Sequence, residues 1–211
     1  MPTKVKICGI ARPEDARCVA DAGADALGLI FVRQSPRFVS TGLAREIAGE
    51  VAGSLSLIGL FVDADAAEVE AVLRDVDLDV LQFHGDEPGS YCEAFGVNYM
   101  KATRVSGPVD VAGLEAEYPG ACCLLLDAYV PGVAGGTGVR LDLACWPEAG
   151  AKPLVLAGGL TPENVADAIS RVRPFGVDVS SGVEGGIKGR KDPERVRKFV
   201  SEVRRVGREG V

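Results

Sequence analysis

Cysteine and aspartate close two of the apolar runs in this sequence, at places where a side chain could take up or release a proton. Cys8 ends the run that begins at Val5 and precedes a glycine, and Asp127 follows three leucines. A thiol whose pKa is lowered by a nearby cation such as Lys6 acts as a base, and a protonated carboxyl group acts as an acid. The two residues predict acid–base catalysis, with an inert core thiol and a loop-capping carboxylate as the alternatives.

Glycine and serine residues close two later apolar runs and predict an anion-binding site. They are Gly158, Gly159, Ser180, Ser181 and Gly182. Backbone N–H groups approach an oxygen-rich ligand closely where glycine leaves no side chain in the way, and a helix that begins nearby adds the positive end of its dipole. Turn geometry alone would explain either segment, but the two together indicate phosphate binding.

Four further polar residues are candidates for contacts around such a site. Arg37 lies in a loop, and its planar guanidinium suits a carboxylate, although most arginines are solvated surface charges. His84 is the only histidine, so it predicts a substrate contact or a packing role and no metal centre. Asp178 is a further substrate-binding candidate. Because side chains alternate along a strand, Asp178 is expected to point inward from its run, as Lys6 does from the first run. The two residues predict a buried ion pair if those strands are neighbours.

Short apolar runs alternate with Ala-, Glu- and Arg-rich stretches of helical period along the whole chain, with no linker between them. Strands are predicted at Val5–Cys8, Ala26–Phe31, Leu57–Val62, Val80–His84, Tyr99–Thr103, Cys122–Asp127, Leu154–Ala157 and Val177–Ser180. Helices are predicted at Pro13–Ala22, Thr41–Val51, Ala64–Arg74, Glu87–Phe95, Val109–Tyr118, Thr161–Val172 and Asp192–Arg205, with a weaker one around Leu141–Trp146. Runs that are apolar on both faces favour a parallel sheet covered on both sides.

Eight alternating strand–helix units in 211 residues predict an α/β fold, a (β/α)8 TIM barrel of minimal size, with residues 1–211 as one domain. A doubly wound open sheet is the alternative, but the segment after the first strand, Gly9–Pro13, lacks the G-x-G-x-x-G loop of dinucleotide folds. In a barrel the carboxyl ends of the strands share one mouth. Cys8 and Asp127, on strands three apart, then face each other across that mouth.

Composition excludes several classes of protein. The chain has a formal charge of −7, 47% hydrophobic residues and 25% charged residues, as a globular protein with a large core has. Its six cysteines form no C-x-x-C pair, so neither a zinc site nor a disulfide framework is predicted. No basic cluster indicates nucleic acid, no run of about 18 apolar residues indicates a membrane span, and no signal peptide precedes the first strand. We expect a cytoplasmic protein, either a monomer or a homodimer.

The polar strand ends together resemble the phosphoribosylanthranilate isomerase family of tryptophan biosynthesis. The segments that carry the resemblance are Lys4–Ile10, Arg12–Ala16, Ser35–Arg37, Gln82–Glu87, Leu126–Ala128, Gly135–Gly138, Leu156–Leu160, Pro162–Val165 and Val177–Glu184, with Gly189, Lys191 and Asp192. They occur in order from about Val5 to Phe199. The resemblance implies a (β/α)8 barrel without a cofactor. It also implies an Amadori rearrangement of the anionic phosphosugar N-(5′-phosphoribosyl)anthranilate to 1-(2-carboxyphenylamino)-1-deoxyribulose 5-phosphate.

Carried over by residue, the resemblance makes Cys8 the general base, Asp127 the general acid and Arg37 the partner of the anthranilate carboxylate. It makes the loops at 158–159 and 180–182 the phosphate cradle. Two departures from the family pattern are present. Leu141 and Leu143 stand where Phe and Trp usually follow the Gly-Thr-Gly loop, and the usual Gln-Leu-His appears with Phe83 in its middle position. The first departure leaves the packing of the sixth loop and helix open.

Two other functions compete with this interpretation. A dual-substrate isomerase that also serves histidine synthesis shares the phosphate loops. That family is expected to have an aspartate at the end of the first strand, where this chain has Cys8. A non-catalytic phosphosugar-binding barrel would keep the phosphate loops without needing both Cys8 and Asp127. The presence of both residues favours the isomerase.

Overall fold

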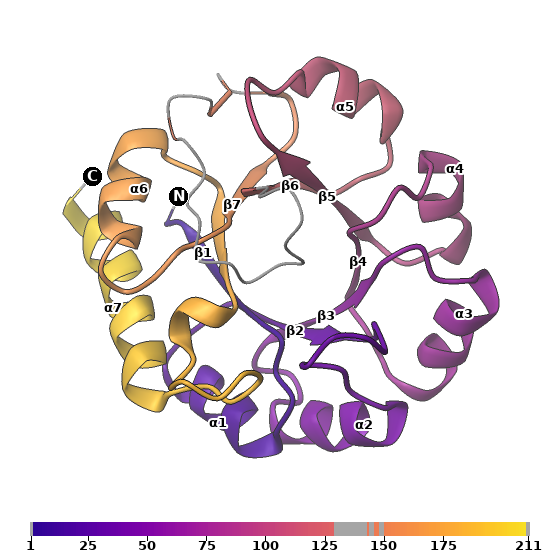
Figure 1. Cartoon of the computed structure of the whole chain (residues 1–211), viewed down its shortest axis with the longest axis horizontal. Coiled ribbons are helices and arrows are strands. Elements are labelled where there is room, and N and C mark those ends of the chain that lie inside the picture. Colours follow the sequence, from indigo (N-terminus) through magenta and orange to yellow (C-terminus); the bar gives the residue numbers. More distant parts are fainter. Residues whose placement is uncertain (1, 129–142, 144–145, 148–149, 210–211) are drawn as a thin grey trace.

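Eight parallel strands close into a barrel in chain order, within the residues that the computed structural model describes, which are 2–128, 143, 146–147 and 150–209. The strands are β1 (Lys4–Cys8), β2 (Ala26–Ile30), β3 (Ser56–Phe61), β4 (Val80–Phe83), β5 (Tyr99–Val105), β6 (Cys123–Ala128), β7 (Leu154–Ala157) and β8 (Gly176–Val179). Because β1 pairs with both β2 and β8, the sheet has no free edge (Figure 1). The predicted barrel is confirmed, and the open doubly wound sheet is excluded.

Helices surround the barrel on its outside (Figure 1). They are α1 (Pro13–Asp21), α2 (Thr41–Glu50), α3 (Ala66–Asp75), α4 (Gly89–Cys92), α5 (Val111–Glu117), α6 (Val165–Val172) and α7 (Pro193–Glu209). Local sequence sets where several of them begin. Pro13 occupies the first turn of α1, where no N–H is needed, and the Ser40 hydroxyl accepts the N–H of Leu43 at the start of α2. None of the described helices is both long and apolar enough to cross a membrane.

The three leucines before Asp127 show why the strands are apolar throughout. Leu124 and Leu126 point outward into the large cluster between barrel and helices, whereas Leu125 points inward into a smaller cluster inside the barrel. All three are fully buried, and each such side chain contributes about 1.5–3 kcal/mol. Since side chains alternate along a strand, Asp127 follows Leu125 on the inner face. Burial on both faces therefore fixes the direction of the residue at the strand end.

The helix ends differ from the predicted ones where local hydrogen bonds compete with the helix. The predicted helix from Glu87 begins after Pro88 as α4 and ends in a single 3₁₀ turn, η1 (Glu93–Phe95). The predicted helix from Thr161 begins four residues later, because the Thr161 N–H donates to the side chain of Asn164 at 2.8 Å and forms a turn. At the other end of the chain, α7 continues to Glu209.

The sixth loop and helix lie largely outside the described residues. This applies to Gly135–Gly138, to Leu141, and to most of the weak helix predicted around Leu141–Trp146. Of that segment, Leu143 and Trp146 are described, and both pack against the outer core as partly buried side chains. Leu143 thus fills an apolar position, as a core-facing residue of a sixth helix would.

Candidate active site

The thiol of Cys8 and the ammonium group of Lys6 meet inside the barrel beside a glycine. Both residues point inward from β1, and Gly28 is the neighbour of Cys8 on β2. A Cβ atom on Gly28 would lie 2.9 Å from Sγ of Cys8 and 3.1 Å from Nζ of Lys6. The missing side chain therefore leaves the room that both groups occupy. This role of Gly28 was not predictable from the sequence, because a glycine within a strand has several uses.

Lys6 and Asp178 form the ion pair that the sequence predicts. Nζ of Lys6 donates to Oδ1 of Asp178 at 2.9 Å, and the two side chains are 6% and 10% exposed. The residues are direct neighbours in the β1–β8 register, so barrel closure creates the pair. Asp178 thereby supports Lys6 beside Cys8, and the substrate contact expected of Asp178 stays a prediction.

Burial outweighs the effect of Lys6 on the Cys8 thiol. Burial raises the pKa of Cys8, whereas the charge of Lys6 lowers it, and the net pKa is above the ordinary thiol value. For Lys6, burial lowers the pKa, but the charges of Asp178 and Cys8 raise it by more than burial lowers it, so the ammonium group stays charged. The direction predicted for the influence of Lys6 is correct, while the thiol of the unliganded protein stays protonated at neutral pH.

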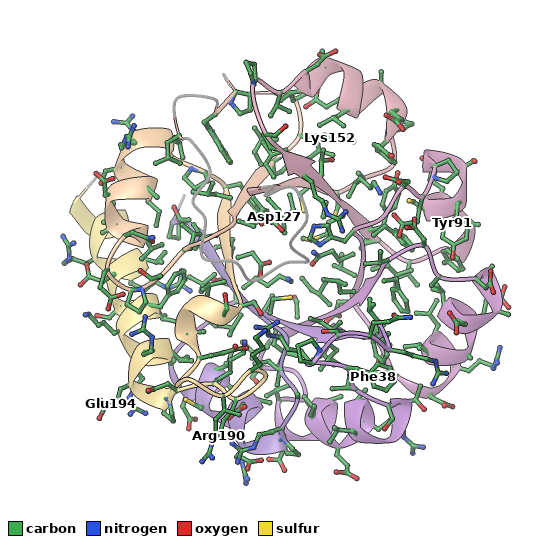
Figure 2. All side chains as sticks on the ribbon, in the orientation of Figure 1. Phe38, Tyr91, Asp127, Lys152, Arg190 and Glu194 are labelled. Atoms are coloured by element: carbon green, nitrogen blue, oxygen red, sulfur yellow. The ribbon has the colours of Figure 1, made fainter. Side chains whose placement is uncertain are left out.

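Asp127 and His84 face each other from β6 and from the end of β4. Nε2 of His84 lies 3.5 Å from Oδ2 of Asp127, at ion-pair distance, and has no hydrogen-bond partner among the described residues. Figure 2 shows Asp127 within the ring, whereas Tyr91, Lys152 and Glu194 lie around it. The Asp127 side chain is 24% exposed, so it is only partly buried at the end of its apolar run. This carboxyl group can exchange protons with a ligand or with solvent at the mouth.

The glycine-rich loops after β7 and β8 contact each other at the same end of the barrel. Gly158 and Gly159 have φ angles of +91° and +61°, which favour glycine, and the side chain of Asn164 donates to the carbonyl of Gly159 at 2.9 Å. A Cβ atom on Gly182 would overlap the carbonyl oxygen of Leu160. These two loops therefore present backbone rather than side chains to the mouth, as a phosphate cradle requires.

Ser180 and Ser181 lie in the loop after β8, where Ser181 opens the short 3₁₀ helix η3 (Ser181–Val183). The hydroxyl oxygen of Ser180 is buried and has no hydrogen-bond partner within the described part of the chain. Buried hydroxyl groups are rarely left unpaired, so this group is suited to an oxygen-rich ligand. Both serines lie where the sequence predicts them.

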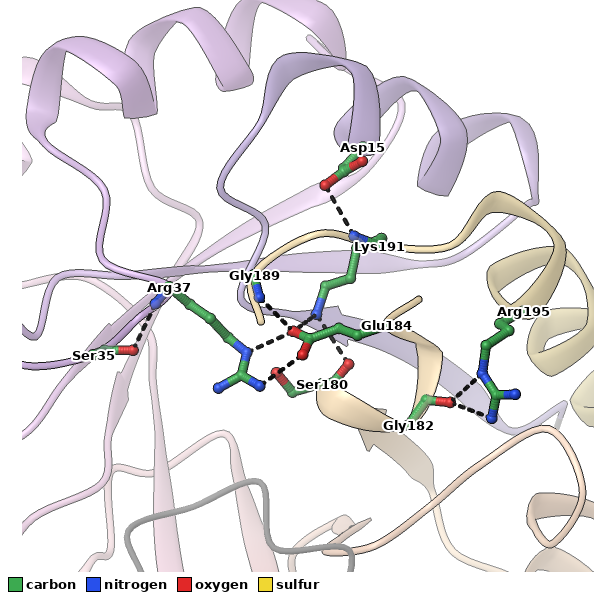
Figure 3. A network of polar contacts seen from close by, with 9 residues as sticks. All are labelled: Asp15, Ser35, Arg37, Ser180, Gly182, Glu184, Gly189, Lys191 and Arg195. Carbon is green, nitrogen blue, oxygen red and sulfur yellow. Dashed lines mark hydrogen bonds and ion pairs between the residues drawn. The ribbon is translucent and has the colours of Figure 1, made fainter. Parts of the chain in front are cut away.

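Arg37 is held by a carboxylate that the sequence reasoning did not assign. Its Nε and Nη2 donate to the two oxygens of Glu184 at 2.7 and 2.9 Å, and Nζ of Lys191 lies 3.2 Å from the same carboxylate (Figure 3). Burial raises the pKa of Glu184, but the cations Arg37 and Lys191 lower it by more than burial raises it, so the net pKa is below the usual value. The only signal in the sequence was that Glu184 and Lys191 both lie in the loop after the last strand.

The fold thus brings the predicted residues to one end of the barrel. Cys8, His84, Asp127, the 158–159 loop and the 180–182 loop all follow or end strands at their carboxyl ends, and Arg37 reaches the same end from the loop after β2. Among the described residues, no group of three or more His, Cys, Asp or Glu side chains is placed to hold a metal ion. The geometry supports proton transfer on an anionic small molecule.

Comparison with known proteins decides which family this site represents. A family model described as N-(5'phosphoribosyl)anthranilate (PRA) isomerase matches residues 5–202. The chain belongs to this family. The N-(5'-phosphoribosyl)anthranilate isomerase of Pseudomonas paraeruginosa is 51% identical over 206 residues, which cover 98% of this chain and 97% of the relative.

Solved structures of phosphoribosyl anthranilate isomerases have the same fold. The crystal structure of the Thermotoga maritima enzyme has a TM-score of 0.87 at 37% identity, covering 96% of this chain and 98% of that one. A second structure, at 34% identity and a TM-score of 0.79 with the same coverage, is a complex with reduced 1-(o-carboxyphenylamino)-1-deoxyribulose 5-phosphate. The family resemblance carried by the strand ends is therefore confirmed.

Proposed function

We propose that Cys8 is the general base and Asp127 the general acid of this isomerase. The chain converts N-(5′-phosphoribosyl)anthranilate to 1-(2-carboxyphenylamino)-1-deoxyribulose 5-phosphate, an Amadori rearrangement in tryptophan biosynthesis. One observation carries the assignment of the two residues. Both side chains point inward at the same end of a closed barrel, from strands that lie three apart, so that a small substrate fits between them.

The first step is opening of the furanose ring. Asp127 donates its proton to the ring oxygen, the C1′–O bond breaks, and the nitrogen lone pair forms the protonated Schiff base at C1′. His84, 3.5 Å from Asp127, lies beside it at the mouth and contacts the reacting end of the substrate. Partial exposure of the Asp127 side chain allows its proton to be replaced from solvent after each turnover.

The second step is removal of the C2′ proton by Cys8. A positive iminium close to the thiol favours the thiolate, so the charge made in the first step lowers the pKa that burial had raised, and the thiol releases its proton to solvent at the mouth before it takes up the C2′ proton. The electron pair of the C2′–H bond moves into the C1′–C2′ bond and neutralises the iminium. The resulting enolamine then tautomerises to the ketone. Lys6, held by Asp178, stabilises the thiolate by charge.

The substrate is held at the mouth through its own two anionic groups. The phosphate binds to backbone N–H groups of the loops at 158–159 and 180–182, and the anthranilate carboxylate binds to Arg37. A solved relative with a bound phosphate-bearing product analogue supports this choice of ligand. The site uses residues of one chain, so it is complete in a monomer and in a homodimer alike. We also place the reaction in the cytoplasm, which is consistent with the biosynthetic role of the family.

Loss of anthranilate fluorescence after addition of phosphoribosylanthranilate tests the function and the two residues together. The unaltered protein should consume the substrate far above the uncatalysed rate. Cys8→Ala and Asp127→Asn should each lower kcat by about 10²–10⁴-fold, the usual contribution of an acid or base. Cys18→Ala, on helix α1, is the matched control and should keep full activity. Turnover of Cys8→Ala near the normal rate would overturn the assignment of the base.

A further inference from the structure

A buried cluster of charges includes the proposed carboxylate-binding residue, Arg37, and none of its members gives or takes a proton in the proposed reaction. It consists of Arg37, Glu184 and Lys191, whose side chains are 9%, 6% and 1% exposed. Glu184 also accepts the N–H of Gly189 at 3.1 Å, and the backbone N–H of Lys191 donates to Asp15 on α1. The cluster therefore ties the loop after β2, the loop after β8 and α1 into one unit (Figure 3).

Glu184 occupies one edge of the Arg37 guanidinium and leaves the other without a partner among the described residues. A guanidinium has five N–H groups in a plane, and a carboxylate can pair with the Nε–Nη2 edge or with the Nη1–Nη2 edge. The Nε–Nη2 edge is taken by the two oxygens of Glu184. Among the described residues, none accepts a hydrogen bond from Nη1. Figure 3 shows this second edge directed away from Glu184.

The stem of Arg37 is confined as closely as its head group. A Cβ atom on Gly9 would lie 2.5 Å from Cδ of Arg37, and one on Gly189 would lie 3.1 Å from the carbonyl oxygen of Pro36. Both glycines have positive φ angles, +73° and +82°, so these close approaches depend on glycine. Arg37 thus fits a slot with little room for another side-chain conformation.

Lys191 extends the cluster to the phosphate end of the site. Its Nζ donates to the carbonyl oxygen of Ser180 at 3.0 Å while it contacts Glu184 at 3.2 Å. The hydroxyl of Ser180, which has no hydrogen-bond partner in the described ranges, lies on the same side, 3.1 Å from the position of a Cβ atom on Gly9. One buried ammonium group therefore connects the residue that orients Arg37 with the loop that binds phosphate.

We propose that Glu184 and Lys191 are positioning residues, which present only the Nη1–Nη2 edge of Arg37 to the substrate carboxylate and fix its distance from the phosphate loop. The inference rests on the proposed function and extends it, because it assigns recognition of the aromatic acid to two residues that do not touch the substrate. The rigid spacing selects a ligand with a phosphate at one end and a planar carboxylate at the other. A mobile Arg37 would bind the carboxylate weakly and in several orientations.

Two simple probes read the two ends of the site separately. Free anthranilate competes at the carboxylate end, and inorganic phosphate competes at the phosphate end. Glu184→Gln removes the charge that holds Arg37 while keeping the size of the side chain. It should raise KM and the inhibition constant of anthranilate by about tenfold or more, change kcat by less than about threefold, and leave the inhibition constant of phosphate within about twofold. Glu202→Gln, which alters an exposed ion pair on α7, is the control.

Lys191→Met gives an independent second reading, since it cuts the connection to Ser180. It should weaken anthranilate and phosphate together, by a few fold each. Thermal unfolding of every variant shows whether it is folded. If Glu184→Gln does not fold, Arg37→Lys provides the first reading, because an ammonium group can pair with Glu184 but has no second edge, and it should reproduce the anthranilate effect alone.

Three outcomes would overturn the inference. These are an unchanged anthranilate inhibition constant in Glu184→Gln, an equal loss of anthranilate and phosphate binding in that variant, and no change of either constant in folded Lys191→Met. An unaltered protein with no isomerase activity would instead refute the proposed function. The two failures are therefore distinguishable.

Discussion

At the scale of single residues, the environment of Cys8 decides how its thiol can act as a base. Burial raises the pKa above the ordinary value of 9.0, and the neighbouring Lys6 offsets this only in part. The free enzyme therefore carries mostly thiol at neutral pH. The cationic Schiff base, once formed, favours the thiolate within the complex. Under the proposed mechanism, the intermediate that needs the base also generates it, and the thiol is less reactive when no substrate is bound.

The pH dependence of turnover tests this description of Cys8. The parameter kcat/KM reports the free enzyme and should keep rising with pH to above 9, whereas the rising limb of kcat should lie at lower pH because it reports the complex. Alkylation by iodoacetamide in the absence of substrate should follow the same high pKa as kcat/KM. Rapid alkylation at pH 7, or rising limbs of kcat and kcat/KM at the same pH, would contradict the argument.

Residues whose position follows from a strand end were predictable from the sequence, and residues that meet through the fold were not. Cys8 and Asp127 end apolar runs, so alternation and barrel closure place them at the mouth. Glu184 meets Arg37 across 147 positions of sequence, and neither loop carries a pattern that specifies the other. The role of Gly28 was equally unpredictable from the sequence, because it depends on which two side chains fill the space over this glycine.

At the scale of elements, the Lys6–Asp178 ion pair links the first and last strands and so bears on barrel closure. Removing one partner leaves a buried charge unpaired, which costs about 3–5 kcal/mol, whereas removing both leaves an apolar interior. We expect Lys6→Met and Asp178→Leu each to lower the free energy of unfolding by about this amount. The double variant should lose much less than their sum. Urea unfolding of the four proteins measures this coupling, and additive losses would refute it.

The contact between the β7 and β8 loops predicts a second effect at this scale. Gly182→Ala places a methyl group on the carbonyl of Leu160, so the two loops must separate. Binding of inorganic phosphate should weaken by about tenfold or more, while the protein stays folded. Gly49→Ala, on helix α2, where a Cβ atom meets nothing within 4 Å, is the matched control. Unchanged phosphate binding in folded Gly182→Ala would remove this loop from the phosphate site.

Elements with a strong apolar period were the most predictable part of the fold. The predicted strand at Leu154–Ala157 agrees with β7 to the residue, and the other strands agree to within two residues at each end. Helix ends were less predictable, because side-chain hydrogen bonds decide them. Asn164 stops α6 from starting at Thr161, and Pro88 delays α4. Such bonds depend on local geometry that residue type alone does not specify.

At the scale of the whole molecule, Asp25 connects the two ends of the chain. Its carboxylate accepts hydrogen bonds from Lys4 at 2.9 Å, from the Val5 N–H at 2.8 Å and from Arg204 on α7 at 2.7 Å. Arg204 also donates to the carbonyl of Thr3 at 3.0 Å. The carboxylate therefore holds β1 and the last helix together on the side of the barrel where the chain closes. It lies outside the proposed active site, so its effects on stability and on activity are separable.

The acid stability of the protein follows from the sign of the pKa shift of Asp25. Burial raises this pKa, but the hydrogen bonds from Lys4 and Arg204 lower it further, to a net value below the ordinary 3.8. A carboxyl group with a lowered folded-state pKa contributes stability above its unfolded pKa and loses it as the pH falls through the folded value. The contribution of Asp25 is thus complete at neutral pH and disappears below about pH 3.8.

Asp25→Asn should therefore lower the free energy of unfolding at pH 7 by about 1.5–3 kcal/mol, with kcat and KM unchanged. The loss should shrink as the pH is lowered below 3.8, since the unaltered protein then loses the same charge. Urea unfolding followed by the fluorescence of the single tryptophan, Trp146, at several pH values measures both effects. Asp167→Asn, on an exposed pair with Arg171 on α6, is the control and should change stability by less than about 0.5 kcal/mol. A stability difference between Asp25→Asn and the unaltered protein that stays constant from pH 7 to pH 3 would show that charge is not the cause.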